Sequence, residues 1–345
     1  MIKNSELYIY DCYLNFKGVI DTYKSLRWRR KYFEAGEFEL HLQASIVNIG
    51  LFQKDTVIIR EDSEEAAFVI GVEINDDGKS TELIITGRFL SYFLYRRIVR
   101  SKITFSGTIL DGMRYVLSNM TPFSILDISD TTIPSEQIKF QCTYKNVYGY
   151  ICKLSKTSNV GFRIRANVKI KRYVFENICG INRTIGQKEN AFYEFSEEYS
   201  NIKKANYVYD SSSLCNYILV GGEGQGDKRY LVEIDNTEGL KDFDIVEKFF
   251  DAKSESKDEQ TSDEEYKEML RTKGQEYIDT IIENINFEAY VHDYKQKWDL
   301  GDVVTVKKES WNIQENLRII EVEEVIEGNV VTVTPVFRNT IKRDF

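Results

Sequence analysis

A glycine cluster is the first stretch of this chain in which ligand chemistry could be sought. Residues 221–227 read Gly-Gly-Glu-Gly-Gln-Gly-Asp. A phosphate-binding loop places Lys-Ser or Lys-Thr after its last glycine and opens a helix, whereas here Lys228-Arg229-Tyr230 leads into a strand pattern. The glycine spacing does not fit a dinucleotide-binding loop either. We interpret the cluster as a wide turn between two strands, where glycine permits the backbone conformation.

Histidines and carboxylates are the next candidates, for metal binding or acid–base catalysis. His41 alternates outward on a predicted strand and His292 ends another, and neither has a second candidate ligand at a recognised spacing. The chain has 55 acidic residues, so most must be solvated and adjacent acidic pairs are uninformative. A glycosidase dyad stays open, because its members need not be close in sequence. We predict no catalytic residue, no metal ligand and no cofactor. The adjacent pairs considered are Glu64 with Glu65, Asp76 with Asp77, and Glu323 with Glu324.

The cysteines indicate a reducing compartment. They are odd in number and widely spaced, and they form no Cys-x-x-Cys motif, so we expect buried free thiols. The N-terminal residues lack the apolar core of a signal peptide, and no stretch approaches the roughly 20 apolar residues of a membrane span. We expect a protein made in the cytoplasm without a signal peptide and without membrane contact. The cysteines are Cys12, Cys142, Cys152, Cys179 and Cys215.

A group of arginines permits two interpretations of equal weight. They form either a polar strand face with a helix edge, or an interface patch that meets acidic neighbours, since arginine is enriched in subunit contacts. Nucleic-acid binding ranks third. The residues are Arg27, Arg29, Arg30, Arg96, Arg97 and Arg100.

Composition favours a β-rich protein with subunit contacts. The chain has 345 residues, 22 Tyr and 20 Phe, and aromatic side chains suit pleated sheets and interfaces. Its net charge of −9 disfavours tight nucleic-acid binding, although a local basic face remains compatible with it. We therefore expect DNA at most in transit.

Hydrophobic periodicity predicts a mainly β fold with inserted α+β parts. Residues 1–103 read as short strands at the spacing of a small, tube-like β-barrel. Residues 104–204 read as an inserted α+β domain. Residues 205–345 read as a second tube-like β-barrel domain, with a charged loop and a helix inserted at about 236–285. We expect three helices, over 109–117 with Thr108 as N-cap, over 147–156, and from about Ser262. The charged run 251–265 is predicted to be a mobile or solvated loop.

Four segments, in this order along the chain, resemble a known family. They are Trp28–Leu40, with its Trp-led strand before Gly-x-Phe-x-Leu; Ile85–Leu90 with Leu94–Ile98; Val220–Arg229; and Trp298–Val304 before the last strands. Together they are similar to the Gp37-like tail proteins of phages of Gram-positive bacteria and cover most of the chain.

The resemblance implies a structural hub at the distal end of a phage tail or phage-tail-like particle, similar to the gp27-like baseplate hubs of contractile tails. Such hubs are homotrimers in which two tube-like β domains per subunit make a pseudo-sixfold ring. The ring joins the hexameric tail tube, or a distal tail protein, to the threefold spike or tip, among other baseplate proteins. The chain would then be made in the bacterial cytoplasm and act in the virion tail or in a released particle.

Other readings stay open beside this one. The resemblance does not separate an infectious phage from a tail-like bacteriocin, or a contractile from a non-contractile tail. We interpret the chain as non-enzymatic. The alternatives are a tail-associated cell-wall hydrolase and a carbohydrate-binding adhesin module.

Overall fold

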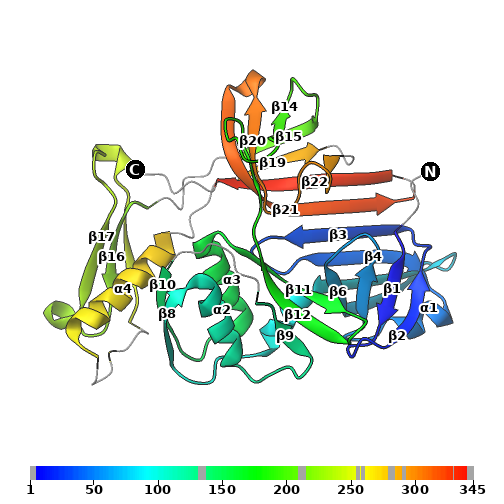
Figure 1. Ribbon diagram of the computed structural model, residues 1–345, viewed down its shortest axis with the longest axis horizontal. Coiled ribbons are helices and arrows are strands. Elements are labelled where there is room, and N and C mark those ends of the chain that lie inside the picture. The colour runs from blue at the N-terminus through cyan, green and yellow to red at the C-terminus, as the bar shows by residue number, and fades with distance from the viewer. Residues whose placement is uncertain are drawn as a thin grey trace.

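The computed structural model describes residues 5–130, 137–208, 215–253, 257, 261–278, 284–289, 293–328 and 330–339. Most of these residues lie in strands, which confirms the predicted mainly β fold with inserted α+β parts. Figure 1 shows one long sheet, an α+β part packed beside it, and a small sheet with helix α4 at the opposite end of the molecule from β1.

The N-terminal half of the long sheet contains seven strands. Side chains alternate between a buried and a wet face, as in β4, where Phe38, Leu40 and Leu42 are buried. The strands pair in the order β3-β4-β7-β6-β5-β1-β2. The elements are β1 (Leu7–Tyr10), β2 (Phe16–Ile20), β3 (Ser25–Lys31), β4 (Glu37–Gln43), helix α1 (Ile46–Leu51), β5 (Val57–Arg60), β6 (Ala66–Asp76) and β7 (Thr81–Phe89).

The C-terminal half of the long sheet repeats this arrangement. Its strands pair in the order β15-β19-β22-β21-β20, which matches β3-β4-β7-β6-β5 strand for strand, and every one of these pairings is antiparallel. Two short strands also pair with β20. The elements are β13 (Asn182–Arg183), β14 (Glu194–Ser196), β15 (Ile202–Val208), β19 (Asn284–Ala289), β20 (Val303–Lys308), the 3-10 turn η5 (Glu309–Trp311), β21 (Ile313–Glu327) and β22 (Val330–Asn339).

The repeat extends to individual backbone hydrogen bonds. The N–H of Asp55 donates to the carbonyl of Val69 at 3.0 Å, and the N–H of Gly301 donates to that of Ile319 at 2.8 Å. Both donors have positive φ, +67° and +94°. The register of the long hairpin shifts directly after Val69 in one half and directly after Ile319 in the other. The two halves therefore share bulge and register as well as strand order.

Strand β3 pairs with β21 and fuses the two halves into one 14-stranded sheet. Among the described strands the path stays open between β15 and β2, so neither of the two predicted tube-like β domains is a closed barrel within the single chain. Side-chain alternation predicts the faces of a strand, but closure depends on which distant strand edges meet.

The α+β part lies between the two halves in sequence. Helix α2 begins after Thr108, whose hydroxyl accepts the N–H of Asp111 at 3.2 Å, and α3 begins after Asn146, whose side chain accepts the N–H of Gly149 at 3.1 Å. Both predicted helices and the predicted cap are confirmed. The elements are the 3-10 helix η1 (Leu90–Arg96), β8 (Ile103–Thr108), α2 (Ile109–Ser118), β9 (Leu126–Ile128), β10 (Gln137–Cys142), α3 (Val147–Ser158), β11 (Gly161–Asn167) and β12 (Arg172–Ile178).

A small sheet with one helix interrupts the C-terminal half. The predicted helix is α4 (Asp263–Ile278), and its first turn is closed reciprocally, since Ser262 Oγ accepts the N–H of Glu265 while the Glu265 carboxylate accepts the N–H of Ser262. Tyr266 and Leu270 of α4 are buried against the sheet. The other elements are β16 (Tyr217–Gly221), η2 (Gly226–Lys228), β17 (Leu231–Asp235), η3 (Asp242–Asp244) and β18 (Glu247–Asp251).

Two predictions fall partly on residues outside those that the structure describes. Within the charged run 251–265, residues 254–256 and 258–260 lie outside the described residues, as do Ile281 and Ile282 of the predicted helix face. None of the described helices is both long enough and apolar enough to span a bilayer.

Candidate functional site: the junction and the open strand edges

The pairing of β3 with β21, called the junction from here on, carries buried charges on an otherwise apolar face. Leu26, Trp28 and Arg30 alternate inward on β3, and Val322, Glu324 and Ile326 do so on β21. Arg30 and Glu324 therefore lie among apolar core side chains. A charge in such a place costs several kcal/mol unless a partner compensates it.

Arg30 has partners from both halves of the sheet. Its guanidinium pairs with Glu65, lies 2.6 Å from Asp299 Oδ1, and donates to the Tyr294 hydroxyl at 2.8 Å. Burial alone would lower the pKa of Arg30, but the Tyr294, Glu65 and Asp299 side chains together hold it well above its ordinary value. Arg30 is therefore a permanent buried cation that ties the halves together.

Arg60 forms the second buried link. Its side chain is fully buried, pairs with Glu324 at 2.5 Å and with Asp62, and lies over the Trp28 ring with its guanidinium carbon 5.7 Å from the ring centroid. Lys295 lies 3.8 Å from Glu324, and burial lowers its pKa against the opposing effect of that carboxylate. Residues of β5, β21 and the segment before β20 thus share one charge network.

The wet face of the junction carries a ladder of partly exposed ion pairs. Arg27 lies 2.5 Å from Glu323, and Arg29 pairs with both Glu37 and Glu321. Burial would raise the pKa of Glu37, but the cations Lys31, Arg88 and Arg29 bring it below its ordinary value. Because the two strands present opposite charges, the ladder selects this pairing over others.

The predicted arginine group does not form one patch. Arg27, Arg29 and Arg30 lie at the junction, whereas Arg96 pairs with Asp55 and stacks on Phe93, with 5.1 Å from its guanidinium carbon to the ring centroid. Arg97 donates to the Thr121 carbonyl at 2.9 Å, and Arg100 is exposed. The side chains of Arg27, Arg29, Arg30 and Arg96 do meet acidic neighbours, and those neighbours belong to the same chain.

The glycine cluster is confirmed as a turn between strands. It joins β16 to the antiparallel β17, and Gly224 and Gly226 take φ values of +104° and +56° that glycine adopts without strain. Arg229 after the turn donates back to the carbonyls of Gly221 and Gly222 at 3.0 Å. The carbonyls of Gly221 and Gly222 therefore accept hydrogen bonds from an arginine of the same loop.

The histidines and cysteines differ in how far they are buried. His41 is partly exposed and contacts Glu39 and Glu82, while His292 lies outside the described residues. All five thiols are free; Cys179 is exposed and Cys12 half-buried, so the prediction of burial is wrong for these two. Alternation cannot identify the exposed positions, because both lie at loop ends. Burial raises the pKa of the Cys142 thiol to about 11 and that of Cys152 to about 12.

Two acidic residues that seemed uninformative are central to the junction. Glu65 and Glu324 are buried, so the expectation that such pairs are merely solvated is wrong for them. For Glu324 a signal existed in the sequence, because it alternates in phase with Val322 and Ile326. For Glu65, in the turn before β6, sequence pattern offers no such signal.

A shallow pocket of about 470 Å³ lies beside β14. Its wall combines aromatic rings with polar groups, among them Phe192, Tyr193, Tyr199, Asn201 and Asp293. The Tyr193 hydroxyl donates to Asp293 at 2.7 Å, and Asn201 holds the loop by donating to the Glu194 carbonyl at 2.7 Å. Burial and the Asp293 carboxylate raise the pKa of Tyr193, so it stays a neutral donor.

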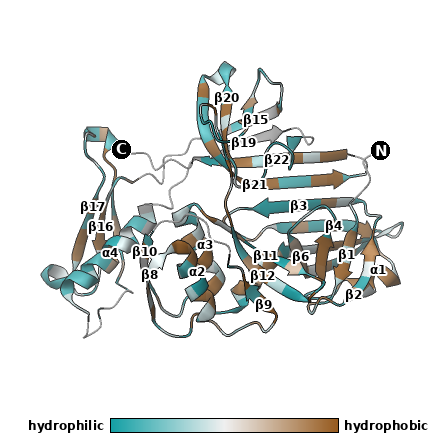
Figure 2. Ribbon diagram, viewed as in Figure 1, coloured by the Kyte–Doolittle hydropathy of each residue, from teal (hydrophilic) through white to brown (hydrophobic). Residues whose placement is uncertain are grey.

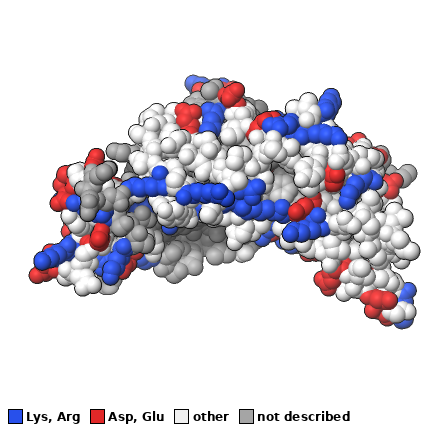
Figure 3. All heavy atoms as spheres, turned by 90° about the horizontal axis from the view of Figure 1, so that it is seen from below, with Lys and Arg blue, Asp and Glu red and all other residues white. Residues whose placement is uncertain are grey.

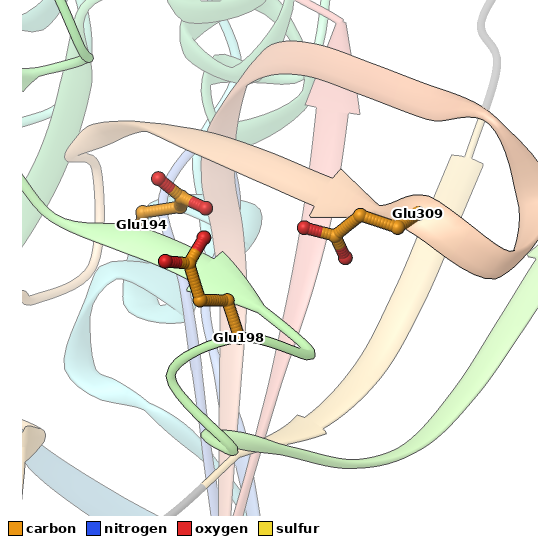
Figure 4. A group of neighbouring side chains, drawn as sticks. All are labelled: Glu194, Glu198 and Glu309. Carbon is orange, nitrogen blue, oxygen red and sulfur yellow. The ribbon is translucent and has the colours of Figure 1, made fainter.

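Three carboxylates converge at the edge of this pocket (Figure 4). Glu194 on β14, Glu198 in the following loop and Glu309 in η5 bring oxygen atoms within 4.8 Å of one another. Lys307 lies 2.9 Å from Glu309 and 3.9 Å from Glu198. This lysine supplies part of the positive charge that the three carboxylates require.

Charge is distributed unevenly over the surface. Figure 3 shows an interrupted band of Lys and Arg side chains across one face, with Asp and Glu towards both ends of the molecule and in smaller groups beside the band. A protein with a net charge of −9 thus presents a local basic band.

The fold is similar to that of solved phage tail proteins. A tail protein from Neisseria meningitidis MC58 matches with a TM-score of 0.59 at 10% identity, covering 98% of this chain and 96% of that one. The prophage tail protein gp18 from Listeria monocytogenes EGD-e matches with a TM-score of 0.56 at 15% identity, covering 98% and 95%. A chain of the Francisella PdpA-VgrG complex matches with a TM-score of 0.50 at 11% identity, covering 98% of this chain and 53% of that one.

The family follows from the sequence match. The chain belongs to the Siphovirus ReqiPepy6 Gp37-like protein family, whose model matches residues 6–337. No curated protein matches it by sequence.

Proposed function

We propose that this protein is the structural hub of a phage tail or tail-like particle, and that three copies form a pseudo-sixfold ring. The observation that carries the proposal is the internal repeat, in which β15-β19-β22-β21-β20 matches β3-β4-β7-β6-β5 within one chain. Three copies of a chain with two equivalent units present six similar units around a threefold axis. Such a ring matches a sixfold tube on one side and a threefold tip on the other.

The junction supports this role because it joins the two units through a continuous sheet and buried ion pairs. Arg30, Arg60 and their partners cross from one half to the other, and breaking buried pairs of this kind is costly. A subunit whose two units keep a constant relative position presents the same geometry in every copy. In this proposal the partners are two further copies, the tail tube or a distal tail protein, the spike or tip protein, and other baseplate proteins.

Mass measurement and particle imaging test the hub directly. Light scattering of the purified chain is expected to give three times the 40.3 kDa mass of one chain, and labelled antibody is expected to mark the distal end of isolated tails. A chain that remains single at every concentration, and that is absent from purified tails, contradicts the proposal.

The pocket beside β14 favours one second candidate, a carbohydrate-binding role. Half-exposed Phe192 and Tyr199 offer ring faces, and Asp293 with Asn201 offers hydrogen-bond partners, the combination by which proteins hold sugar rings. Pull-down on purified Gram-positive cell walls tests it, with Tyr199→Ala as the variant and Tyr13→Ala, another exposed tyrosine, as the matched control. Equal retention of the two variants contradicts sugar binding at the pocket, and wall lysis by the isolated chain would instead indicate a hydrolase.

A further inference from the structure

β15 and the outer stretch of β6 are two of the strand edges of the long sheet that lack a partner within the described part of the chain. β15 ends the sheet and pairs only with β19, and β6 pairs with β5 only up to Val69. From Gly71 to Asp76, β6 is paired with β7 on one side and leaves its other side open. Open edges expose unpaired backbone donors and acceptors, which soluble proteins normally cover.

The internal repeat shows what covers the equivalent edge in the other half. β21 corresponds to β6, and its outer stretch after the bulge, from Glu321 to Glu327, pairs antiparallel with β3. Since β3 corresponds to β15 in strand order, the junction is a contact between one β6-type edge and one β3-type edge.

We propose that β15 of one copy pairs antiparallel with residues 73–76 of β6 in the next copy, repeating the junction between subunits. The inference rests on the proposed ring and names the contact that closes it. Each copy then has one β6 edge and one β15 edge to offer, so three copies contain three internal junctions and three equivalent contacts between chains. A head-to-tail contact of this kind closes into a ring when the rotation between copies is 120°.

The repeat also fixes the register. The two halves align at the bulge, where Val69 corresponds to Ile319, and the pairing with β7 and β22 continues outward from it. In this alignment Val72 corresponds to Val322 and Asn75 corresponds to Val325. On the next strands, Glu39 of β4 corresponds to Asn286 of β19. Since Arg27 pairs with Glu39 and Asn206 pairs with Asn286, Asn206 corresponds to Arg27. Because Val325 faces Arg27 at the junction, Asn75 of one copy faces Asn206 of the next.

The exposed apolar side chains of β6 are consistent with a further strand beside its open edge in the assembly. Val72 and Ile74 are 43% and 49% exposed, although their hairpin partners Ile85 and Leu83 are fully buried. The equivalent Val322, which β3 covers, is 0% exposed. An added strand would bury the two apolar side chains and satisfy the open backbone groups at once.

The charge ladder is not copied between subunits. Arg29 of β3 corresponds to Val208 of β15, so Glu73 would face an apolar residue where Glu323 faces Arg29. The contact between copies therefore relies on backbone hydrogen bonds and apolar burial. We expect it to be weaker than the junction, as suits subunits that fold first and assemble afterwards.

Exposed apolar side chains of helix α1 lie in the same half of the molecule as β6. Ile46 and Val47 are exposed, and Figure 2 shows α1 coloured as hydrophobic beside the N-terminal strands. This surface is consistent with a buried position in an assembly, but the proposal rests on the β6 and β15 edges.

Disulfide trapping tests the register. Asn75→Cys and Asn206→Cys are combined in a chain whose half-buried and exposed native thiols are replaced, Cys12→Ser and Cys179→Ser. Directly opposed residues of paired strands have Cα atoms about 4.5–5.5 Å apart, within the range a disulfide bridges. Mild oxidation is expected to convert most chains into a covalent trimer on a non-reducing gel. Both new positions are exposed, so the substitutions leave the fold intact.

The matched control shifts one position. Ile74→Cys with Asn206→Cys places the two thiols on opposite faces of the paired strands, and little cross-linking is expected. Equal cross-linking of both pairs overturns the register. A non-covalent trimer in which the cysteines of Asn75→Cys and Asn206→Cys stay reduced contradicts the strand pairing but not the ring. A chain that is single by light scattering at every concentration overturns both.

Hydrogen exchange of the unaltered chain gives a second readout without any substitution. In the assembled protein, amides of residues 73–76 whose N–H groups point to the open edge are expected to exchange at least tenfold more slowly than in the dissociated chain. Unchanged exchange over these residues in a confirmed trimer contradicts the pairing.

Discussion

Strands β21 and β6 have the same place in the two halves of the sheet but opposite surroundings. The outer stretch of β21 is covered by β3, and its Val322 and Glu324 are buried; the outer stretch of β6 is open, and its Val72 and Ile74 are half exposed. The same hairpin with the same bulge thus serves as interior in one half and as surface in the other. The difference teaches that burial along these strands follows from the neighbouring strand and not from the hairpin itself.

The largest expected effect is at the buried charges of the junction. Arg30→Ala leaves Glu65 buried without its cation, so we expect a loss of about 3–5 kcal/mol in the free energy of unfolding. Urea unfolding followed by tryptophan fluorescence measures it, since Trp28 is buried at the junction. Arg27→Ala on the wet face of the same strand is the control, with an expected loss of about 1 kcal/mol or less. Similar losses for both variants would mean that the buried network stabilises the fold no more than the exposed ion pair does.

The equivalent valines permit the most direct test of the comparison between the two edges. Val322→Ala removes a buried side chain, and we expect a loss of roughly 1.5–3 kcal/mol. Val72→Ala, measured on the unassembled chain at low concentration, is expected to change the free energy of unfolding by about 0.5 kcal/mol or less, because this side chain is half exposed. The same Val72→Ala variant is expected to weaken trimer formation at higher concentration. Equal losses for both variants in the unassembled chain would show that the β6 edge is covered within one chain.

The smallest expected effect comes from acid. The pKa of Glu37 in the folded chain lies below its ordinary value of 4.5, so the unfolded chain binds more protons near that pH. The stabilisation from its cation partners is complete above about pH 4.5 and is lost as pH falls through the lowered pKa, and it amounts to no more than about 1 kcal/mol for a partly exposed group. Stability measured from pH 6 down to pH 3 is expected to fall less steeply in Glu37→Gln than in the unaltered chain. If stability falls equally steeply with pH in both, carboxylates other than Glu37 cause the loss of stability in acid.

Local patterns in the sequence were enough for most of the elements. Alternation identified the strand that contains His41, which is β4, and Thr108 and Ser262 marked the starts of α2 and α4. These features depend on contacts within a few residues, so they can be recognised without the fold. The short strands β13 and β14 were not predicted, because their pairing depends on β20, which is more than 100 residues away along the chain. The 3-10 helix η1 was not predicted either.

The candidate site was predictable only in part. Arginine enrichment on β3 pointed to a contact with acidic residues, but the sequence left open whether the partners lay in this chain or in another. Glu321, Glu323 and Glu324 are about 290 residues away from β3 along the chain, a separation that no local pattern bridges. Arg60 shows the same limit, since its partner Glu324 is 264 residues away.

The sequence by itself determined which residues form strands, which faces of those strands are apolar, where the helices begin, and that one family's motifs run through the chain. Only the tertiary structure decided that the two halves share a strand order, that β3 closes the edge of β21, and that the edge of β6 stays open. The physical reason is that side-chain periodicity sets the faces of a strand, whereas edges pair through backbone groups that are the same in every residue.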